Sequence, residues 1–228
     1  LRFKPDGTKM YALQYNDKVH EYTLSTAFDV TTASASASSL VLTGTNNTGI
    51  AFKPDGTKMY SCDNTNVTQY SLSTAWDIST MTYDSVAFSI FSQTGTSEGL
   101  GFSPDGLRMI VVDNSGDYLL QYSLSTAWDI STASYDNVSF DMGLQNISPR
   151  DIAFNSNGSR VYVVKGQTGV FYEYDIASTH TVTYDTALNW PDGSAPFSPN
   201  FDETDVITIS TRDGGTTYNA VQAMNGVK

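Results

Sequence analysis

The sequence has little of what many metal-binding and nucleic-acid-binding proteins need. Cys62 is the one cysteine among 228 residues, so an intrachain disulfide and a zinc site of several thiolates are both excluded. Lys and Arg number 12 against 24 Asp and Glu, a net charge of −12. Phosphate tracking and docking on anionic lipid need clustered cations, so neither is expected. No run of 18 apolar residues exists, which excludes a helix that spans a membrane.

Sustained helical periodicity is also missing from the chain. Instead, Tyr, Val, Ile, Thr and Phe alternate with polar residues over short segments, as half-buried strands require. Aromatic residues reach 12%, enough to build a core, so the chain is expected to be ordered. It opens on Leu1-Arg2-Phe3, inside a pattern that recurs whole later, which predicts a piece of a longer polypeptide.

Internal repetition is the strongest signal in the sequence. A nine-residue block with a Pro-Asp-Gly turn occurs at Phe3–Tyr11, Phe52–Tyr60, Phe102–Ile110 and, in a decayed form, Phe154–Tyr162. The leading phenylalanines are 49, 50 and 52 residues apart. A second block follows each copy, at Glu21–Val30, Gln69–Ile78, Gln121–Ile130 and, weakly, Glu173–Val182. A fixed period of this length is typical of stacked repeat folds.

Each unit is predicted to contain four short strands. In the second unit these are Gly49–Lys53, Lys58–Cys62, Val67–Leu72 and Val86–Phe91. Pro presets the backbone of the first turn and Gly takes its positive φ. We predict an all-β, propeller-like array of four repeats over residues 1–185, with the leading Phe and the Met or Val after the turn between blades. Kelch repeats have a similar length, but the paired glycines that mark them are missing from this sequence. A β-solenoid is the main structural alternative.

The pattern changes in residues 186–228, where we predict a small C-terminal β module. Two strands, Asp205–Thr211 and Thr216–Ala223, flank Arg212-Asp213-Gly214-Gly215, which is a hairpin signal. A diverged fifth blade is the alternative. Trp190-Pro191-Asp192-Gly193 has no counterpart in the repeats, which favours a separate module.

Three residues are candidates for a ligand-binding surface. Glu98 precedes a strand at the edge of a blade nearest the propeller axis, and Arg150 and Asp151 occupy the corresponding loop of the next unit. Propellers often place ligand contacts on such loops, although an exposed loop charge is the simpler explanation. Glu21 and Glu173 alternate with Gln69 and Gln121 at one repeat position, which suggests a solvated strand face.

Residues that could carry chemistry mostly occupy scaffold positions. His20 and His180 stand where other units have different residue types, and no Gly-x-Ser-x-Gly nucleophile elbow is present. Cys62 is expected to be a small buried hydrophobe. Trp76 and Trp128 recur at one position, so packing is expected there rather than stacking on sugars. No catalytic residue and no cofactor is predicted.

Two acidic turns offer oxygen ligands of the kind calcium prefers. They are Asp63-Asn64-Thr65-Asn66 and Asp113-Asn114-Ser115-Gly116-Asp117. Neither has the order of an EF-hand loop, and Asx turns explain both without a metal. Whether the chain binds a metal stays open at this point.

Two motifs carry a resemblance to known families. The blocks at 52–60 and 69–80 resemble a propeller-like repeat of marine bacterial and phage surface proteins. The segment Asn189–Pro196, with Asp213-Gly214-Gly215-Thr216-Thr217-Tyr218, resembles the C-terminal module of phage tail-fibre proteins. It departs from that pattern after Tyr218.

The resemblance implies a virion protein without enzymatic activity, structural or receptor-binding, at the virion or outside the cell. Its implied partners are further copies of the chain, with a trimer as one form, other virion proteins, and a host glycan or protein. A bacterial adhesion propeller and a polysaccharide-degrading enzyme are the alternatives. An enzyme of the latter kind needs a pair of carboxylates in one pocket.

Overall fold

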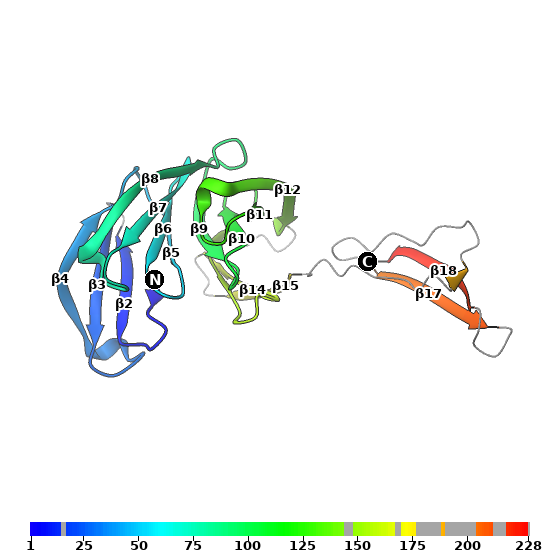
Figure 1. The fold of residues 1–228 in the computed structure, drawn as a ribbon, viewed down its shortest axis with the longest axis horizontal. Coiled ribbons are helices and arrows are strands. Elements are labelled where there is room, and N and C mark those ends of the chain that lie inside the picture. Colours follow the sequence, from blue (N-terminus) through cyan, green and yellow to red (C-terminus); the bar gives the residue numbers. More distant parts are fainter. Residues whose placement is uncertain are drawn as a thin grey trace. The chain divides into compact units, whose positions relative to one another are not determined.

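The protein folds into antiparallel sheets that repeat along the chain (Figure 1). The computed structural model describes residues 1–14, 17–143, 148–166, 170–176, 188–189, 204–211 and 218–227. Within them, four sheets are arranged as a four-bladed β-propeller, which confirms the predicted fold class. None of the described helices is long and apolar enough to cross a membrane.

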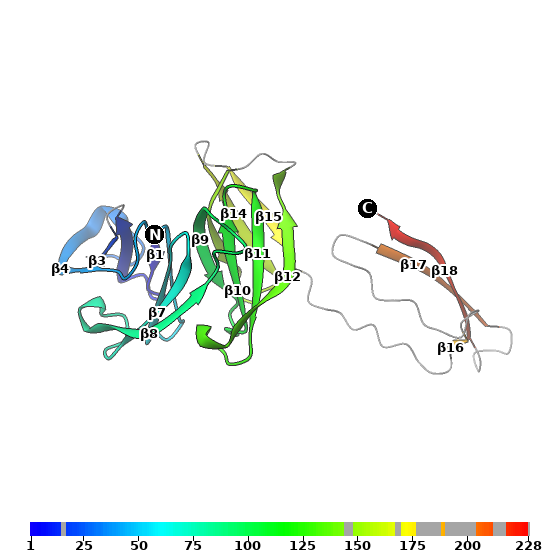
Figure 2. The ribbon, with the colours of Figure 1, turned by 90° about the horizontal axis from the view of Figure 1, so that it is seen from above.

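The blades follow the repeats of the sequence. Blade 1 contains β1 (Arg2–Phe3), β2 (Lys9–Gln14), β3 (Lys18–Leu24) and β4 (Ala33–Val41). Blade 2 contains β5 (Gly49–Phe52), β6 (Lys58–Cys62), β7 (Asn66–Leu72) and β8 (Met81–Ser89). Blade 3 contains β9 (Ser97–Phe102), β10 (Arg108–Asp113), β11 (Tyr118–Leu124) and β12 (Ala133–Asp141), and blade 4 contains β13 (Pro149–Phe154), β14 (Arg160–Lys165) and β15 (Phe171–Asp175). Figure 2 shows β9 to β12 as one sheet beside β14 and β15.

The fourth strand of blade 2 begins earlier than predicted, at Met81 instead of Val86. The reason is a single 3-10 turn, η2 (Ile78–Thr80), which reverses the chain at once. The Asp77 side chain caps this turn by accepting from the backbone N–H of Ser79 at 3.0 Å. Equivalent turns, η1 (Val30–Thr32) and η3 (Ile130–Thr132), precede β4 and β12.

The Pro-Asp-Gly turn is held by its own side chains. In blade 2 the Asp55 carboxylate accepts from the backbone N–H of Thr57 at 2.9 Å and pairs with Lys53 at 2.7 Å. Burial by itself raises the pKa of Asp55, but the hydrogen bonds from Lys53 and Thr57 outweigh it and lower the pKa to about 2. The carboxylate therefore stays ionised, and the turn intact, in all but strong acid.

The glycine of this turn is covered by an aromatic ring from the second sequence block. Gly56 has a φ of +74°, and a Cβ there would lie 2.2 Å from Cδ1 of Trp76. Trp76 itself has a positive φ of 62°, and its backbone N–H donates to the Gly56 carbonyl at 3.0 Å. The same arrangement joins Phe28 to Gly7 and Trp128 to Gly106. The two repeated blocks therefore recur together because each depends on the other.

Blades 1 and 2, and likewise blades 2 and 3, are joined by a repeated set of contacts, which we name the blade lock. The Tyr11 hydroxyl donates to the Trp76 carbonyl at 2.6 Å, and the Tyr60 hydroxyl donates to the Trp128 carbonyl at 2.5 Å. Burial of these hydroxyls raises the pKa of both tyrosines, so both remain donors.

A second contact of the blade lock corrects the sequence analysis. Glu21 and Gln69 were predicted on a solvated strand face, but both are buried. The Glu21 carboxylate accepts from the backbone N–H of Ile78, and the Gln69 amide oxygen accepts from that of Ile130, each at 3.2 Å. Their position faces the neighbouring blade, whose 3-10 turn supplies an N–H that needs an acceptor.

Three apolar clusters fill the spaces between consecutive blades. Met59, Met109 and Val161, which follow the last three of the four turns, are fully or almost fully buried in them, whereas Met10 after the first turn is half-buried. Phe52 packs on Tyr11 with ring centroids 4.5 Å apart. The prediction that the leading Phe and the residue after the turn pack between blades is confirmed.

The second compact unit covers residues Ala177–Lys228. Its described strands are β16 (Leu188–Asn189), β17 (Thr204–Thr211) and β18 (Tyr218–Val227). β17 and β18 pair antiparallel, and β16 pairs with β18 in parallel. The boundary predicted at residue 185, together with His180 and the Trp190–Gly193 segment, lies outside the described residues.

Gly56→Ala tests the contact between the turn and the aromatic ring. We expect a loss of unfolding free energy of about 2–4 kcal/mol, because the new Cβ meets the Trp76 ring and the residue keeps a positive φ. Gly95→Ala is the matched control, since a Cβ at Gly95 meets nothing within 4 Å. Urea unfolding of the two variants measures the difference. Equal stability of both variants would contradict the role given to the ring.

Asp55 predicts a loss of stability in acid. Its pKa in the fold, about 2, lies below its usual value of about 3.9. Its contribution is therefore complete above the usual value and disappears as the pH falls through the lower one. Urea midpoints at about pH 5 and about pH 2.5 should differ less in Asp55→Asn than in the wild type. An unchanged difference would assign the acid sensitivity to other carboxylates.

Candidate functional site

The first strands of the blades lie close together because they carry small residues. A Cβ at Gly99 in β9 would lie 2.8 Å from the Cα of Asp151 in β13. A Cβ at Gly49 in β5 would lie 2.9 Å from the sulfur of Cys62 and 3.1 Å from the Cα of Gly99. Any larger side chain at either glycine would push these strands apart. The glycines therefore set how closely β5, β9 and β13 approach one another.

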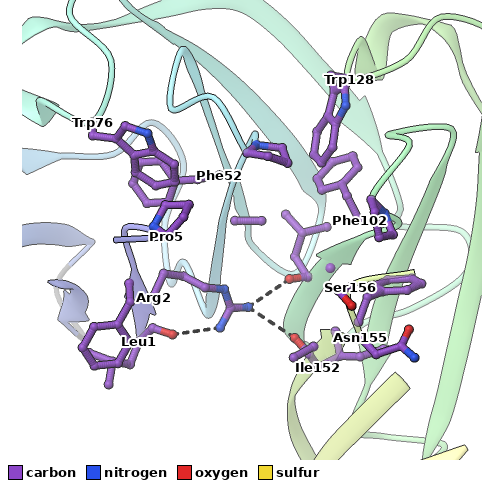
Figure 3. A pocket seen from close by; sticks show the side chains of 18 residues that line it. Leu1, Arg2, Pro5, Phe52, Trp76, Phe102, Trp128, Ile152, Asn155 and Ser156 are labelled. Atoms are coloured by element: carbon purple, nitrogen blue, oxygen red, sulfur yellow. Dashed lines mark hydrogen bonds between the residues drawn. The ribbon is translucent and has the colours of Figure 1, made fainter. Parts of the chain in front are cut away.

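Arg2 of β1 bridges blade 1 to blades 3 and 4. Its guanidinium forms a bidentate pair with Asp151, at 2.6 and 2.8 Å, and donates to the Leu100 carbonyl at 3.1 Å. Figure 3 shows this guanidinium also directed at the carbonyl of Ile152. Burial by itself lowers the pKa of Arg2, but the hydrogen bonds and charge of Asp151 raise it overall. The pair ties together residues 149 positions apart.

The three predicted site residues do not share one site. Glu98 and Arg150 form an ion pair at 2.6 Å between blades 3 and 4, and Asn114 donates to the same Glu98 oxygen at 3.5 Å. Asp151 is committed to Arg2 instead. The close approach of β9 and β13 explains why Glu98 and Arg150 meet. Their role in ligand binding stays a prediction.

Arg2 is the residue that sequence reasoning missed. The same repeat position holds Ala51, Gly101 and Ala153 in the other units. Small residues at this position in three units indicate that the position is crowded. A charged residue there needs a partner, so the arginine in the first unit could have predicted an ion pair. The position of Asp151, which is Gly49 and Gly99 in other units, carried the same signal.

A groove of about 790 Å³ opens beside Arg2 (Figure 3). The leading phenylalanine of every blade lines it, as do the prolines that follow in the first three; these residues are Phe3, Phe52, Phe102 and Phe154 with Pro5, Pro54 and Pro104. Its volume and its mainly apolar walls fall within the range of small-molecule sites, but the groove is open to solvent rather than enclosed.

Two tryptophans complete the wall of the groove. Phe52 stacks on Trp76, and Phe102 lies against Trp128, both with ring centroids 5.2 Å apart. The tryptophans are almost fully buried, so the prediction that they pack inside the fold is confirmed. Phe52 is half-buried and offers part of its ring to the groove.

The aspartates of the two acidic turns already accept hydrogen bonds from protein donors. Asp63 accepts from the backbone N–H groups of Thr65 and Asn66, each at 2.7 Å. Asp113 accepts from the hydroxyl of Ser115 and the backbone N–H of Gly116, both at 2.9 Å. These are Asx turns. Among the described residues no group of three or more His, Cys, Asp or Glu is placed to hold a metal ion.

The remaining reactive side chains lie apart from the groove. His20 lies 2.6 Å from the Gln14 side chain on the neighbouring strand. Cys62 is buried, and this burial raises the pKa of its thiol to about 11. A thiol with this pKa is a poor nucleophile near neutral pH, in agreement with the prediction of a buried structural cysteine.

Comparison with known proteins identifies the fold. No protein-family model and no curated protein matches the chain. A structure named "putative 6-phosphogluconolactonase" from Bacteroides uniformis matches with a TM-score of 0.51 and 17% identity, over 96% of this chain and 68% of its own. Another of that name from Bacteroides fragilis matches with a TM-score of 0.54 and 16% identity, over 76% of this chain and 49% of its own.

A third match is the β-propeller domain of Cps50 (Swd1) from Myceliophteria thermophila, with a TM-score of 0.50 and 10% identity. It covers 77% of this chain and 53% of the other. The chain thus spans about half the length of two of these three propellers. At 10–17% sequence identity, these matches show that the chain shares the fold of these proteins.

The comparisons correct one prediction from the sequence. The chain was predicted not to be an enzyme, but two of the propellers that it matches bear the name of an enzyme. The sequence prediction rested on the lack of a recognisable catalytic motif. That reasoning was insufficient, because a fold can bring catalytic groups together from distant parts of the chain, and such groups need form no local motif.

Asp151→Asn tests the bridge from Arg2. We expect the unfolding free energy to fall by about 1.5–3 kcal/mol, because the guanidinium loses its charged partner. Glu98→Gln is the control, since it weakens the more exposed pair with Arg150 and should cost less than about 1 kcal/mol. Thermal and urea unfolding compare the two. A larger loss in Glu98→Gln would show that the bridge from Arg2 is not the dominant one.

Proposed function

We propose that this chain is a glycan-binding propeller, with its ligand site in the phenylalanine-lined groove. The observation that carries the proposal is that the leading Phe of all four blades lines one groove. Sugar rings have apolar C–H faces that pack on aromatic rings, and repeated platforms suit a repeating ligand. Of the two predicted kinds of host ligand, the groove favours a glycan over a protein.

The charge of the protein favours a neutral glycan. The net charge of −12 disfavours the approach of a polyanion. The cation that lines the groove, Arg2, already has both terminal nitrogens bound to Asp151. An acidic sugar therefore has to compete with a carboxylate that is held by two hydrogen bonds.

We further propose display on a particle or a cell surface. The support is the resemblance of the repeats and of the C-terminal segment to phage tail-fibre and surface proteins. In an oligomer, grooves that bind single glycans weakly would act together, because the first contact raises the effective concentration for the next. A phage tail fibre is the preferred setting, and a bacterial adhesion protein is the alternative.

Hydrolysis of a phosphorylated sugar lactone is the second candidate function. It is favoured by the names of two matched propellers. Arg2 supplies the guanidinium that suits a phosphate group, provided that the phosphate displaces Asp151. Release of acid from 6-phosphogluconolactone, followed with a pH indicator, tests this activity directly.

Phe52→Leu tests the glycan proposal. A panel of neutral oligosaccharides is titrated by calorimetry, and the one that binds best is carried forward. We expect Phe52→Leu to bind it about tenfold more weakly, about 1.4 kcal/mol, because the aromatic platform is lost while apolar bulk remains. Phe88→Leu is the control, since Phe88 is also half-buried but packs edge-on against Tyr122.

The outcomes separate the candidates. A loss of affinity in Phe52→Leu alone supports the groove as the glycan site. Equal affinity of both variants places the glycan elsewhere and refutes the groove. Failure of every neutral oligosaccharide to bind, with turnover of the lactone, replaces the glycan proposal with the enzyme.

A further inference from the structure

Blade 4 departs from the other blades at one position of the groove wall. The residue two places after the leading phenylalanine is Pro5, Pro54 and Pro104 in the first three blades, and Ser156 in the fourth. All four of these residues line the groove (Figure 3). Blade 4 therefore brings a hydroxyl to a place where the other blades bring an apolar ring.

This position is open to solvent inside the repeat array as well as at blade 4. Pro54 and Pro104 are exposed, although blades 2 and 3 each pack against a described blade on both sides. Ser156 is exposed in the same way. The exposure of its hydroxyl therefore follows from its place in the turn and does not depend on what lies beside blade 4.

The Ser156 hydroxyl is available to a ligand. Among the described residues it has no hydrogen-bond partner. The turn that carries it is held against blade 3, because a Cβ at Gly158 would lie 2.9 Å from Cδ of Pro104. A hydroxyl can both donate and accept, as the hydroxyls of a sugar do, so the two can pair in either direction.

The other polar side chains that line the groove are used within the protein. Arg2 is held by the bidentate pair described above. The Asn155 side chain donates to the Ser159 hydroxyl and accepts from the backbone N–H of Arg160, each at 3.1 Å. The indole nitrogens of the two tryptophans face the turn glycines, 2.2 Å from the point where a Cβ would stand. Ser156 therefore offers the groove a hydrogen-bonding group that the protein does not use itself.

We propose that Ser156 determines which glycan the groove binds, by hydrogen bonding to a hydroxyl of the sugar at blade 4. This inference rests on the glycan site proposed above. The sugars over blades 1–3 meet phenylalanine and proline rings, and such apolar contact differs little between similar sugars. A sugar without the matching hydroxyl leaves the serine unpaired, so this one contact distinguishes ligands that the aromatic rings accept equally. A polar contact at one blade also fixes the direction in which the glycan lies.

The test uses the neutral oligosaccharide selected by calorimetry above and a set of its analogues, each lacking one hydroxyl. We expect Ser156→Ala to bind the parent oligosaccharide about fivefold more weakly than the wild type does. One analogue should bind the wild type with the same loss, and should bind Ser156→Ala as well as the parent does. Such a match identifies the hydroxyl that Ser156 meets, and a change in the shape of the turn would not produce it.

Two further variants serve as controls. Ser156→Pro restores the residue of the other three blades, so the turn should fold and the affinity should fall by a similar factor. Ser139→Ala removes another exposed serine hydroxyl, on β12 and outside the groove lining, and should bind like the wild type. Circular dichroism melts confirm that each variant is folded.

Three outcomes overturn the inference. If Phe52→Leu weakens binding and Ser156→Ala does not, the groove remains the glycan site but Ser156 does not select its ligand. If every analogue that binds the wild type weakly binds Ser156→Ala with the same further loss, the serine acts on the turn instead of on the sugar. Failure of every oligosaccharide to bind the wild type overturns the glycan site, and this inference with it.

Discussion

The propeller depends on one arrangement, in which a glycine turn holds an aromatic residue whose carbonyl accepts from a tyrosine of the preceding blade. Gly56 has a positive φ, and the Trp76 ring covers this glycine. In that position the Trp76 carbonyl accepts from the Tyr11 hydroxyl, so the hydrogen bond between blades depends on the turn and on the ring. A four-stranded blade cannot bury its two faces alone, so contacts between blades stabilise the repeats, and this one joins blades 1, 2 and 3.

The same arrangement produces the groove. The leading phenylalanines lie at the interfaces between blades, with one side against the tyrosine or tryptophan and the other toward the open space. If the groove is the glycan site that we propose, packing and ligand recognition use the same residues. Selectivity has to come from residues that depart from the repeat, and Arg2 and Asp151 are the clearest of these. Their mutual pairing leaves the groove largely apolar.

The fold could be predicted from the sequence because its determinants are local and repeated. The turn around Gly56 and the strand Lys58–Cys62 were predicted at the right residues. The site was predicted only in part: Glu98 and Arg150 meet, but the partner of Asp151 was not foreseen. Buried Gln69 was misplaced because an acceptor for the N–H of a neighbouring blade looks, in the sequence, like any polar residue on a strand.

By itself, the sequence determined the period, the turns and the pairing of strands within each blade, because residues a few positions apart control these through φ preferences and side-chain capping. The tertiary structure alone decided which charges pair across blades and which repeat positions are covered. Arg2 finds Asp151 across the whole array, and Phe28 is exposed where Trp76 is buried. Both depend on which blade stands next to which, and no local pattern contains that information.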